Sequence, residues 1–245
     1  MDSSPLAPAD PPVAAPGPLV AQPFLDGALA ILAALMLGVV IAVVQRFRTG
    51  HFDAGNSTIL IVLSEAPFLL IGLWRVRRNL RKQLLADAVF TGDLKRAVAL
   101  GFATGAGILL LGVALISALA GIFGSKHLPR VLEDMLAGAT GWKAAVVLTV
   151  VALIGPIAEE VFFRAGMFAP LFASGRFWLG AVLSSALFSV AHGNLLLAPY
   201  YFILGVILCG VFAATRNLAA PIVAHITLNG TACLMFVLSR AYNLH

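Results

Sequence analysis

Seven apolar runs, each long enough to cross a bilayer, account for most of this 245-residue sequence. A transmembrane helix needs about 20 consecutive, mostly apolar residues. A backbone surrounded by lipid has to satisfy its own hydrogen bonds, which favours helices. Charged residues make up only 11% of the chain, whereas a soluble domain usually contains about a quarter. The sequence therefore predicts an all-α fold, namely a polytopic membrane bundle of about seven transmembrane helices.

The apolar runs also suggest how the chain is divided. They lie at about 24–44, 58–74, 98–123, 143 onward, 177–192, 195–214 and 218–238. The end of the fourth run stays open, because residues 168–172 are still apolar, and the polar stretch 124–141 is expected to be a loop.

Three parts follow from this pattern. Residues 1–23 are rich in Pro and Ala, so they cannot bury a core and are expected to form a disordered tail. Residues 24–97 are expected to form an N-terminal transmembrane pair with a basic cytoplasmic or interfacial segment. Residues 98–245 then form a transmembrane bundle, and its last four helices are the expected four-helix catalytic core.

The distribution of positive charge predicts the orientation in the membrane. The formal net charge is +5, and cytoplasmic loops of membrane proteins carry an excess of Lys and Arg. With seven spans, ten of the 16 Lys and Arg residues fall on one side and six on the other. The N-terminus is therefore expected to be cytoplasmic. Aromatic residues do not interleave with a basic patch, so no nucleic-acid partner is expected.

Two adjacent carboxylates, Glu159 and Glu160, lie in the fourth apolar run. An ionisable group at bilayer depth is costly, and it usually faces the bundle interior and serves a function. Arg164 follows Glu160 by four residues, which is the favourable order for a helical ion pair. Glu159 lies about 100° away around the helix. Arg164 is thus expected to hold Glu160 as a structural residue and to leave Glu159 as a general base that takes a proton from water.

Two further motifs lie in the fifth and seventh runs, each with a spacing of four residues. Phe188 and His192 share one helix face, as do His225 and Asn229. His192 is expected to share a water with Glu159 or to orient that carboxylate. An imidazole N–H and an amide N–H aimed at one point can stabilise an oxyanion. The set indicates peptide-bond hydrolysis. The sequence offers no obvious serine or cysteine nucleophile, because none is paired with a histidine that a third group orients.

Each motif also has a purely structural interpretation. A charge cluster at a helix end can be interfacial, and a single histidine on an apolar helix is often a packed residue. Asn229 can hold two helices together, and Phe188 is expected to pack around His192. Glu65, beside Pro67 in the second run, is interpreted as pairing with a neighbour or kinking the helix. The structural interpretations explain the motifs less well when the motifs are considered together, because nearly all the unpaired ionisable groups lie in the second half of the chain.

The motifs together resemble the type II CAAX prenyl protease and bacteriocin-processing (CPBP, or Abi) family of intramembrane proteases. The residues that carry the resemblance are Glu159-Glu160-xxx-Arg164, Phe188-xxx-His192 and His225-xxx-Asn229. It covers about residues 146–238, and it implies a helical bundle that hydrolyses peptide bonds of membrane-associated substrates.

The resemblance also implies a role for each motif residue. Glu159 and His192 would activate a water, and His225 and Asn229 would form the oxyanion site. The supporting residues would be Glu160, Arg164 and Phe188. No cofactor is expected, and the substrate would be a membrane-associated peptide or protein, such as a prenylated CAAX C-terminus or a bacteriocin leader.

Three other functions remain open from the sequence. Glu159, His192 and His225 are a ligand set that zinc hydrolases use, so a membrane metalloprotease is one alternative. A non-catalytic membrane scaffold or regulator with a packed polar network is another. A small transporter with a proton relay is a third.

One point of the sequence pattern argues against a simple bundle of straight helices. Glu159 lies well along its run and His225 near the start of the seventh, whereas His192 falls late in the fifth. Helix tilt, or an irregular stretch lining a cavity, is needed to bring these side chains together.

Overall fold

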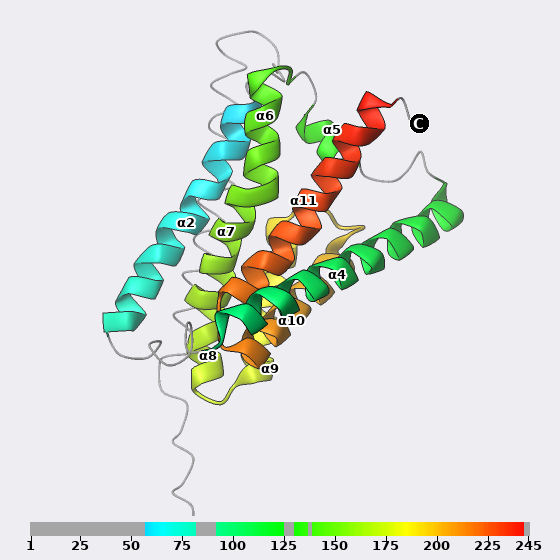
Figure 1. Cartoon of the computed structure of the whole chain (residues 1–245). Helices are drawn as coiled ribbons and strands as arrows, with labels where there is room; N and C mark the ends of the chain where they lie inside the picture. Colours follow the sequence, from blue (N-terminus) through cyan, green and yellow to red (C-terminus); the bar gives the residue numbers. More distant parts are fainter. Residues whose placement is uncertain (1–56, 82–91, 125–129, 137–138, 243–245) are drawn as a thin grey trace, which may run out of the picture.

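The structure, a computed structural model, describes residues 57–81, 92–124, 130–136 and 139–242, and within these ranges it contains helices and no β-strand (Figure 1). The α-helices are α2 Ser57–Arg81, α4 Leu94–Phe123, α5 Val131–Met135, α6 Trp142–Thr149, α7 Gly155–Glu160, α8 Ala169–Ala173, α9 Phe177–Ala191, α10 Ala198–Thr215 and α11 Ala219–Ala241. Two π-helical segments, η3 Val150–Ile154 and η4 Val161–Phe168, lie between them. The predicted all-α fold is confirmed.

Four helical stretches are long and apolar enough to cross a membrane: 94–123, 142–173, 198–215 and 219–241. They correspond to the third, fourth, sixth and seventh predicted runs, and the chain is an integral membrane protein. α9 is apolar but only 15 residues long. The predicted second run, 58–74, is shorter than α2, which continues to Arg81 and takes part of the basic segment into the helix.

Two other expectations have different outcomes. The stretch 124–141 is not entirely loop, because the short helix α5 lies within it. The predicted tail 1–23 and the first run, 24–44, lie outside the described residues.

The longest helical stretch is a rod of 32 residues, 142–173, in which α6, η3, α7, η4 and α8 follow one another without a break. Pro156 near the start of α7 has no N–H to donate, so it removes a backbone hydrogen bond inside the rod. π-Helical turns accommodate such interruptions and occur frequently at functional sites. The two adjacent glutamates lie between the two π segments. These segments are an irregular stretch of the kind that the sequence left open as an alternative to helix tilt.

Side chains from neighbouring helices bind backbone carbonyls of η4, the second π segment. Arg75 Nε of α2 donates to Gly166 O at 3.0 Å, and Ser184 Oγ of α9 donates to Phe163 O at 3.0 Å. Buried carbonyls need such partners, so the neighbouring helices stabilise the irregular backbone of the rod.

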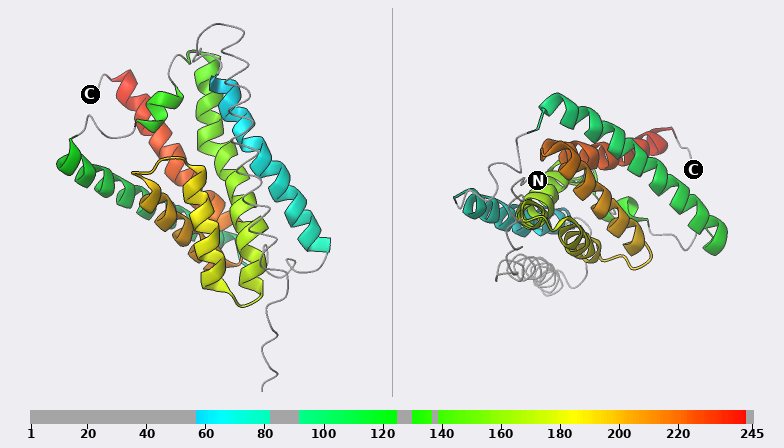
Figure 2. Two further views of the ribbon diagram at one scale, coloured as in Figure 1. Left: turned by 180° about the vertical axis from the view of Figure 1, so that it is seen from behind. Right: turned by 90° about the horizontal axis from the view of Figure 1, so that it is seen from below.

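The rod contacts α2, α9 and α11 (Figures 1 and 2). Small residues let the helices of the bundle approach closely. A Cβ on Gly101 of α4 would lie 2.7 Å from Ala220 O of α11, and a Cβ on Gly205 of α10 would lie 2.7 Å from the Ser185 Cβ of α9. These glycines therefore fix the spacing of two helix pairs around the rod.

A row of buried aromatic rings links α2, the rod and α9. Edge-to-face contacts join Phe68 to Phe162 at 5.3 Å, Phe162 to Phe163 at 4.8 Å and Phe163 to Phe188 at 5.2 Å between ring centroids. This arrangement suits the quadrupoles of the rings. Because the row ends at Phe188, it holds the end of α9 that carries His192 against the rod.

Candidate active site

A cavity of about 440 Å³ lies among α2, the rod, α10 and α11. This volume is within the usual range for ligand pockets. Its lining includes Glu159, His192, His225 and Asn229. The structure therefore brings the three sequence motifs to one place, although they lie on three separate helical stretches: the rod, the end of α9 and α11.

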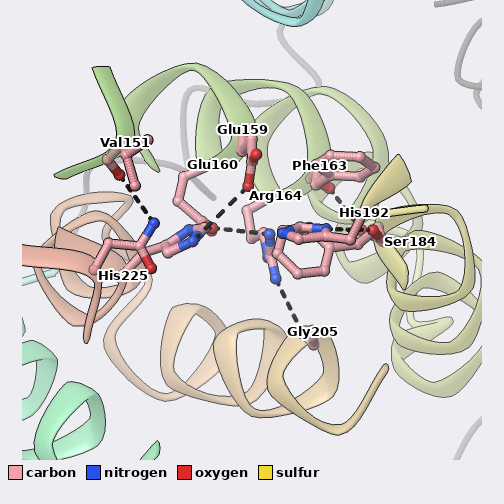
Figure 3. A network of polar contacts seen from close by, with 11 residues as sticks. Val151, Glu159, Glu160, Phe163, Arg164, Ser184, His192, Gly205 and His225 are labelled. Atoms are coloured by element: carbon pink, nitrogen blue, oxygen red, sulfur yellow. Dashed lines mark hydrogen bonds and ion pairs between the residues drawn. The ribbon is translucent and has the colours of Figure 1, made fainter. Parts of the chain in front are cut away.

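Glu160 and Arg164 form a buried ion pair at the site (Figure 3). Arg164 Nη1 lies 2.9 Å from Glu160 Oε1, and both side chains are fully buried. Arg164 Nη2 also donates to Gly205 O at 3.4 Å, and the guanidinium lies 4.7 Å from the centroid of the Phe188 ring. A buried charge needs such partners. The ion pair therefore has a structural role, because each residue neutralises the buried charge of the other.

His225 binds the same carboxylate oxygen. Its Nδ1 lies 2.8 Å from Glu160 Oε1, and because Arg164 holds Glu160 as a carboxylate that only accepts, Nδ1 is the donor. The imidazole ring is thereby fixed in orientation, and its Nε2 faces Glu159 Oε2 at 3.8 Å. The sequence did not predict this contact, because His225 and Glu160 are 65 positions apart.

The two adjacent glutamates differ in their surroundings. The Glu160 side chain has no exposed surface, whereas that of Glu159 is 16% exposed and lines the cavity. Within the described part of the chain, Glu159 Oε2 has no hydrogen-bond partner, and its 3.8 Å separation from His225 Nε2 exceeds hydrogen-bond length. Glu159 is thus the carboxylate that can act on a molecule in the cavity.

His192 follows the last residue of α9. Its Nδ1 lies 2.8 Å from Phe188 O. A carbonyl only accepts, so Nδ1 carries the proton and Nε2 is the ring nitrogen left for other contacts. The ring also stacks on Tyr201 with centroids 4.0 Å apart and contacts the Phe188 ring at 4.5 Å. Phe188 is fully buried and packs around His192, as the sequence indicated.

The position of His192 along the bundle explains how it reaches the cavity. A helix of 15 residues rises about 22 Å, less than the roughly 30 Å of the hydrocarbon core. Figure 2 shows that α9 ends part-way along the rod. Because α9 is short, His192 at its end lies at the depth of the cavity.

Asn229 lies one turn after His225 on α11 and also lines the cavity. Its Nδ2 donates to Val151 O in η3 at 3.0 Å. A side-chain amide has two N–H donors, so one remains after this bond is made. The contact with Val151 was not predicted, because nothing in the sequence shows that η3 would have a carbonyl turned toward α11.

The sequence interpretation did not place two of the cavity residues at the site. Tyr201 stacks on His192, and Glu65 of α2 lines the same cavity as Glu159. Glu65 Oε2 is buried and has no hydrogen-bond partner in the described ranges, so the expected pairing with a neighbour is not found there. An acid inside an apolar run was the available signal.

Ser189 and the candidate metal ligands can also be placed. Ser189 Oγ donates to Ala198 O at 2.7 Å and is engaged with the backbone. Among the described residues, no three His, Cys, Asp or Glu side chains are arranged to hold a metal ion.

Comparison with known proteins supports the family resemblance. Residues 141–231 match the family model described as type II CAAX prenyl endopeptidase Rce1-like. This segment is similar to the Rce1-like family. It contains all the motif residues on which the resemblance rested, and the resemblance is thereby confirmed.

Two curated relatives match parts of the chain. The membrane-embedded CAAX protease MroQ of Staphylococcus aureus (strain USA300) is 29% identical over 146 residues, which are 57% of this chain and 57% of MroQ. YdiL of Bacillus subtilis (strain 168), named as a membrane peptidase, is 29% identical over 90 residues, which are 37% of each protein. The chain thus spans little more than half of MroQ and less of YdiL. No solved structure matches it.

Proposed function

We propose that this chain is an intramembrane endopeptidase that hydrolyses peptide bonds of membrane-associated substrates. The observation that carries the proposal is the unequal environment of the two adjacent glutamates. Glu160 is fully buried and bound to Arg164 and His225, whereas Glu159 opens on the cavity beside His225 and His192. One carboxylate is thus free to act as a base in a site that a substrate can enter.

In the proposed reaction, Glu159 takes a proton from a water that His192 helps to position. The resulting hydroxide attacks the carbonyl carbon of the scissile bond. A positioned general base typically contributes about 10²–10⁴-fold to the rate.

The developing negative charge on the carbonyl oxygen is stabilised by His225 and Asn229 on α11. The remaining amide N–H of Asn229 is one donor. His225 Nε2 is a second donor when the ring carries a proton on both nitrogens, since Nδ1 is already bound to Glu160. Donors that are fixed before the reaction are effective because they need little reorganisation in the transition state. Arg164, Glu160 and Phe188 keep the His225 ring in place.

The proposed substrates are CAAX-type C-termini or other membrane peptides such as bacteriocin-like leaders. The names of the matched family and of MroQ support a CAAX-type substrate. Apolar side chains such as Leu204 and Leu228 line the cavity beside its polar groups, which suits a peptide segment with apolar residues.

The test is mass spectrometry of new protein termini in membranes of cells that express the chain. Cells with the wild-type chain should contain new termini that are missing in cells with Glu159→Ala. Glu133→Ala is the matched control, because Glu133 is an exposed acid of α5 paired with Arg130, and it should give the wild-type termini. The same termini with Glu159→Ala would refute the proposed function.

A further inference from the structure

Glu65 places a third carboxyl group in the candidate active site. A Cβ on Gly155 would lie 3.4 Å from Glu65 Cδ and 3.6 Å from its Oε1, so this carboxyl group rests against the Gly155 backbone. Gly155 begins α7 and precedes Glu159 by four residues. Residues four apart lie on the same face of an α-helix, about 6 Å apart along its axis. The carboxyl groups of Glu65 and Glu159 therefore face the cavity from neighbouring positions.

Both carboxyl groups line the same cavity. Two carboxylates in one poorly solvated site do not both ionise readily and tend to share a single proton. The surroundings distinguish the two. In the described ranges, Glu65 Oε2 and Glu159 Oε2 are both buried without a hydrogen-bond partner, but Glu159 Oε2 also lies 3.8 Å from an imidazole nitrogen of His225. In the arrangement that the imidazole favours, the negative charge lies on Glu159 and the proton on Glu65.

We infer that Glu65 is a second catalytic carboxyl group, the general acid that protonates the leaving amine during peptide-bond hydrolysis. The inference rests on the proposed function. A single site that pairs an ionised and a protonated carboxyl group has the base and the acid that hydrolysis requires.

The protons and bonds balance without any additional reactant. Water transfers one proton to Glu159, and its oxygen forms a bond to the carbonyl carbon. When the C–N bond breaks, the nitrogen takes the proton of Glu65, and the products are a carboxylic acid and an amine. Glu65 is then a carboxylate and Glu159 a carboxylic acid, and transfer of one proton from Glu159 to Glu65 restores the starting state.

The test compares two leaving groups. The probes are a peptide with the sequence around the cleavage site mapped in the terminus experiment, and the same sequence with the scissile amide replaced by an ester of a phenol. A phenolate leaves without protonation, whereas an amine needs a proton. Glu65→Gln has nearly the same shape as the native side chain but cannot give up a proton. It should lower kcat on the peptide by about 10²–10⁴-fold, and it should leave ester cleavage within about tenfold of wild type.

Three variants serve as comparisons. Glu159→Gln should lose the activity on both probes, because both need an activated water. Glu133→Gln, at an exposed acid of α5, should behave as wild type on both. Glu65→Asp keeps an acid and should recover part of the peptide activity, which makes the test independent of whether the Gln variant folds.

Equal losses on peptide and ester in Glu65→Gln, or no loss on either, would overturn the assignment of Glu65 while leaving the endopeptidase proposal intact. A Glu65→Asp variant whose kcat on the peptide is no higher than that of Glu65→Gln would also overturn the assignment of Glu65. If the wild-type chain produces no cleavage site, or Glu159→Gln retains activity, the proposed function itself fails and the role of Glu65 fails with it.

Discussion

Replacing Arg164 with Ala should destabilise the folded protein strongly, because it leaves Glu160 as an unpaired buried charge. Removing one partner of a buried ion pair costs about 3–5 kcal/mol, whereas an exposed pair contributes about 0–1 kcal/mol. The structure decides between these two ranges, since both side chains are fully buried. Loss of the guanidinium contact with the Phe188 ring, 4.7 Å from its centroid, acts in the same direction.

The expected change in melting temperature follows from this free energy. For a chain of 150–250 residues, each kcal/mol shifts the melting temperature by about 2–4 °C. A loss of 3–5 kcal/mol therefore predicts a decrease of about 6–20 °C. Activity should also fall, because Glu160 without Arg164 no longer holds His225 Nδ1 in a fixed position.

Thermal unfolding of the purified protein in detergent measures this effect. A thiol-reactive fluorophore is a suitable probe, because Cys209 and Cys233 are free and buried and become accessible when the protein unfolds. Arg130→Ala is the matched control. Arg130 pairs with Glu133 at 3.3 Å on the surface, so its loss should change stability by no more than about 1 kcal/mol.

A second variant separates the unpaired charge from the lost packing. Arg164→Met with Glu160→Gln removes both charges, and it should recover part of the stability that Arg164→Ala loses. An Arg164→Ala protein with an unchanged melting temperature and no activity would refute this reasoning and would indicate that Arg164 contacts the substrate.

Three further predictions concern the oxyanion site, the helix packing and metal dependence. Asn229→Ala should lower kcat by about 10²–10³-fold with little change in KM, the pattern of an interaction made in the transition state; a wild-type kcat would exclude the role. Gly101→Leu should destabilise the fold by about 1–3 kcal/mol, because a Cβ there would lie 2.7 Å from Ala220 O; an unchanged melting temperature would show that α4 shifts freely. Purified protein should lack stoichiometric metal by elemental analysis and stay active after treatment with a chelator that is then removed; one zinc per chain that tracks with activity would favour a site at Glu159, His192 and His225.

Local sequence spacing was sufficient to predict the contacts made within a single helix. The Glu160–Arg164 pair and the packing of Phe188 on His192 both join residues four apart, and both are found. Hydrophobic run length located the long apolar helices that follow residue 92, because membrane helices must be long and apolar. The ends of α2 and the short helix α5 were missed, since hydropathy does not show where a helix passes beyond the bilayer.

Contacts between helices could not be predicted in the same way. The bonds from His225 to Glu160 and from Asn229 to Val151 depend on how α11 packs against the rod, and single-sequence spacing contains no information about helix rotation. The π segments were also absent from the sequence interpretation, because hydrophobic periodicity does not distinguish a π turn from an α turn. The position of Glu65 in the cavity could not be predicted for the same reason: nothing in its own run shows which helix it faces.

The most direct test of the central claim is the turnover of purified protein in liposomes, with the peptide defined by terminus mapping as substrate. Glu159→Gln should lower the rate of peptide-bond cleavage by about 10²–10⁴-fold, while its melting temperature stays at the wild-type value, because Glu159 Oε2 makes no hydrogen bond within the described residues. Cleavage by folded Glu159→Gln at the wild-type rate would contradict the account and end the assignment of Glu159 as the base.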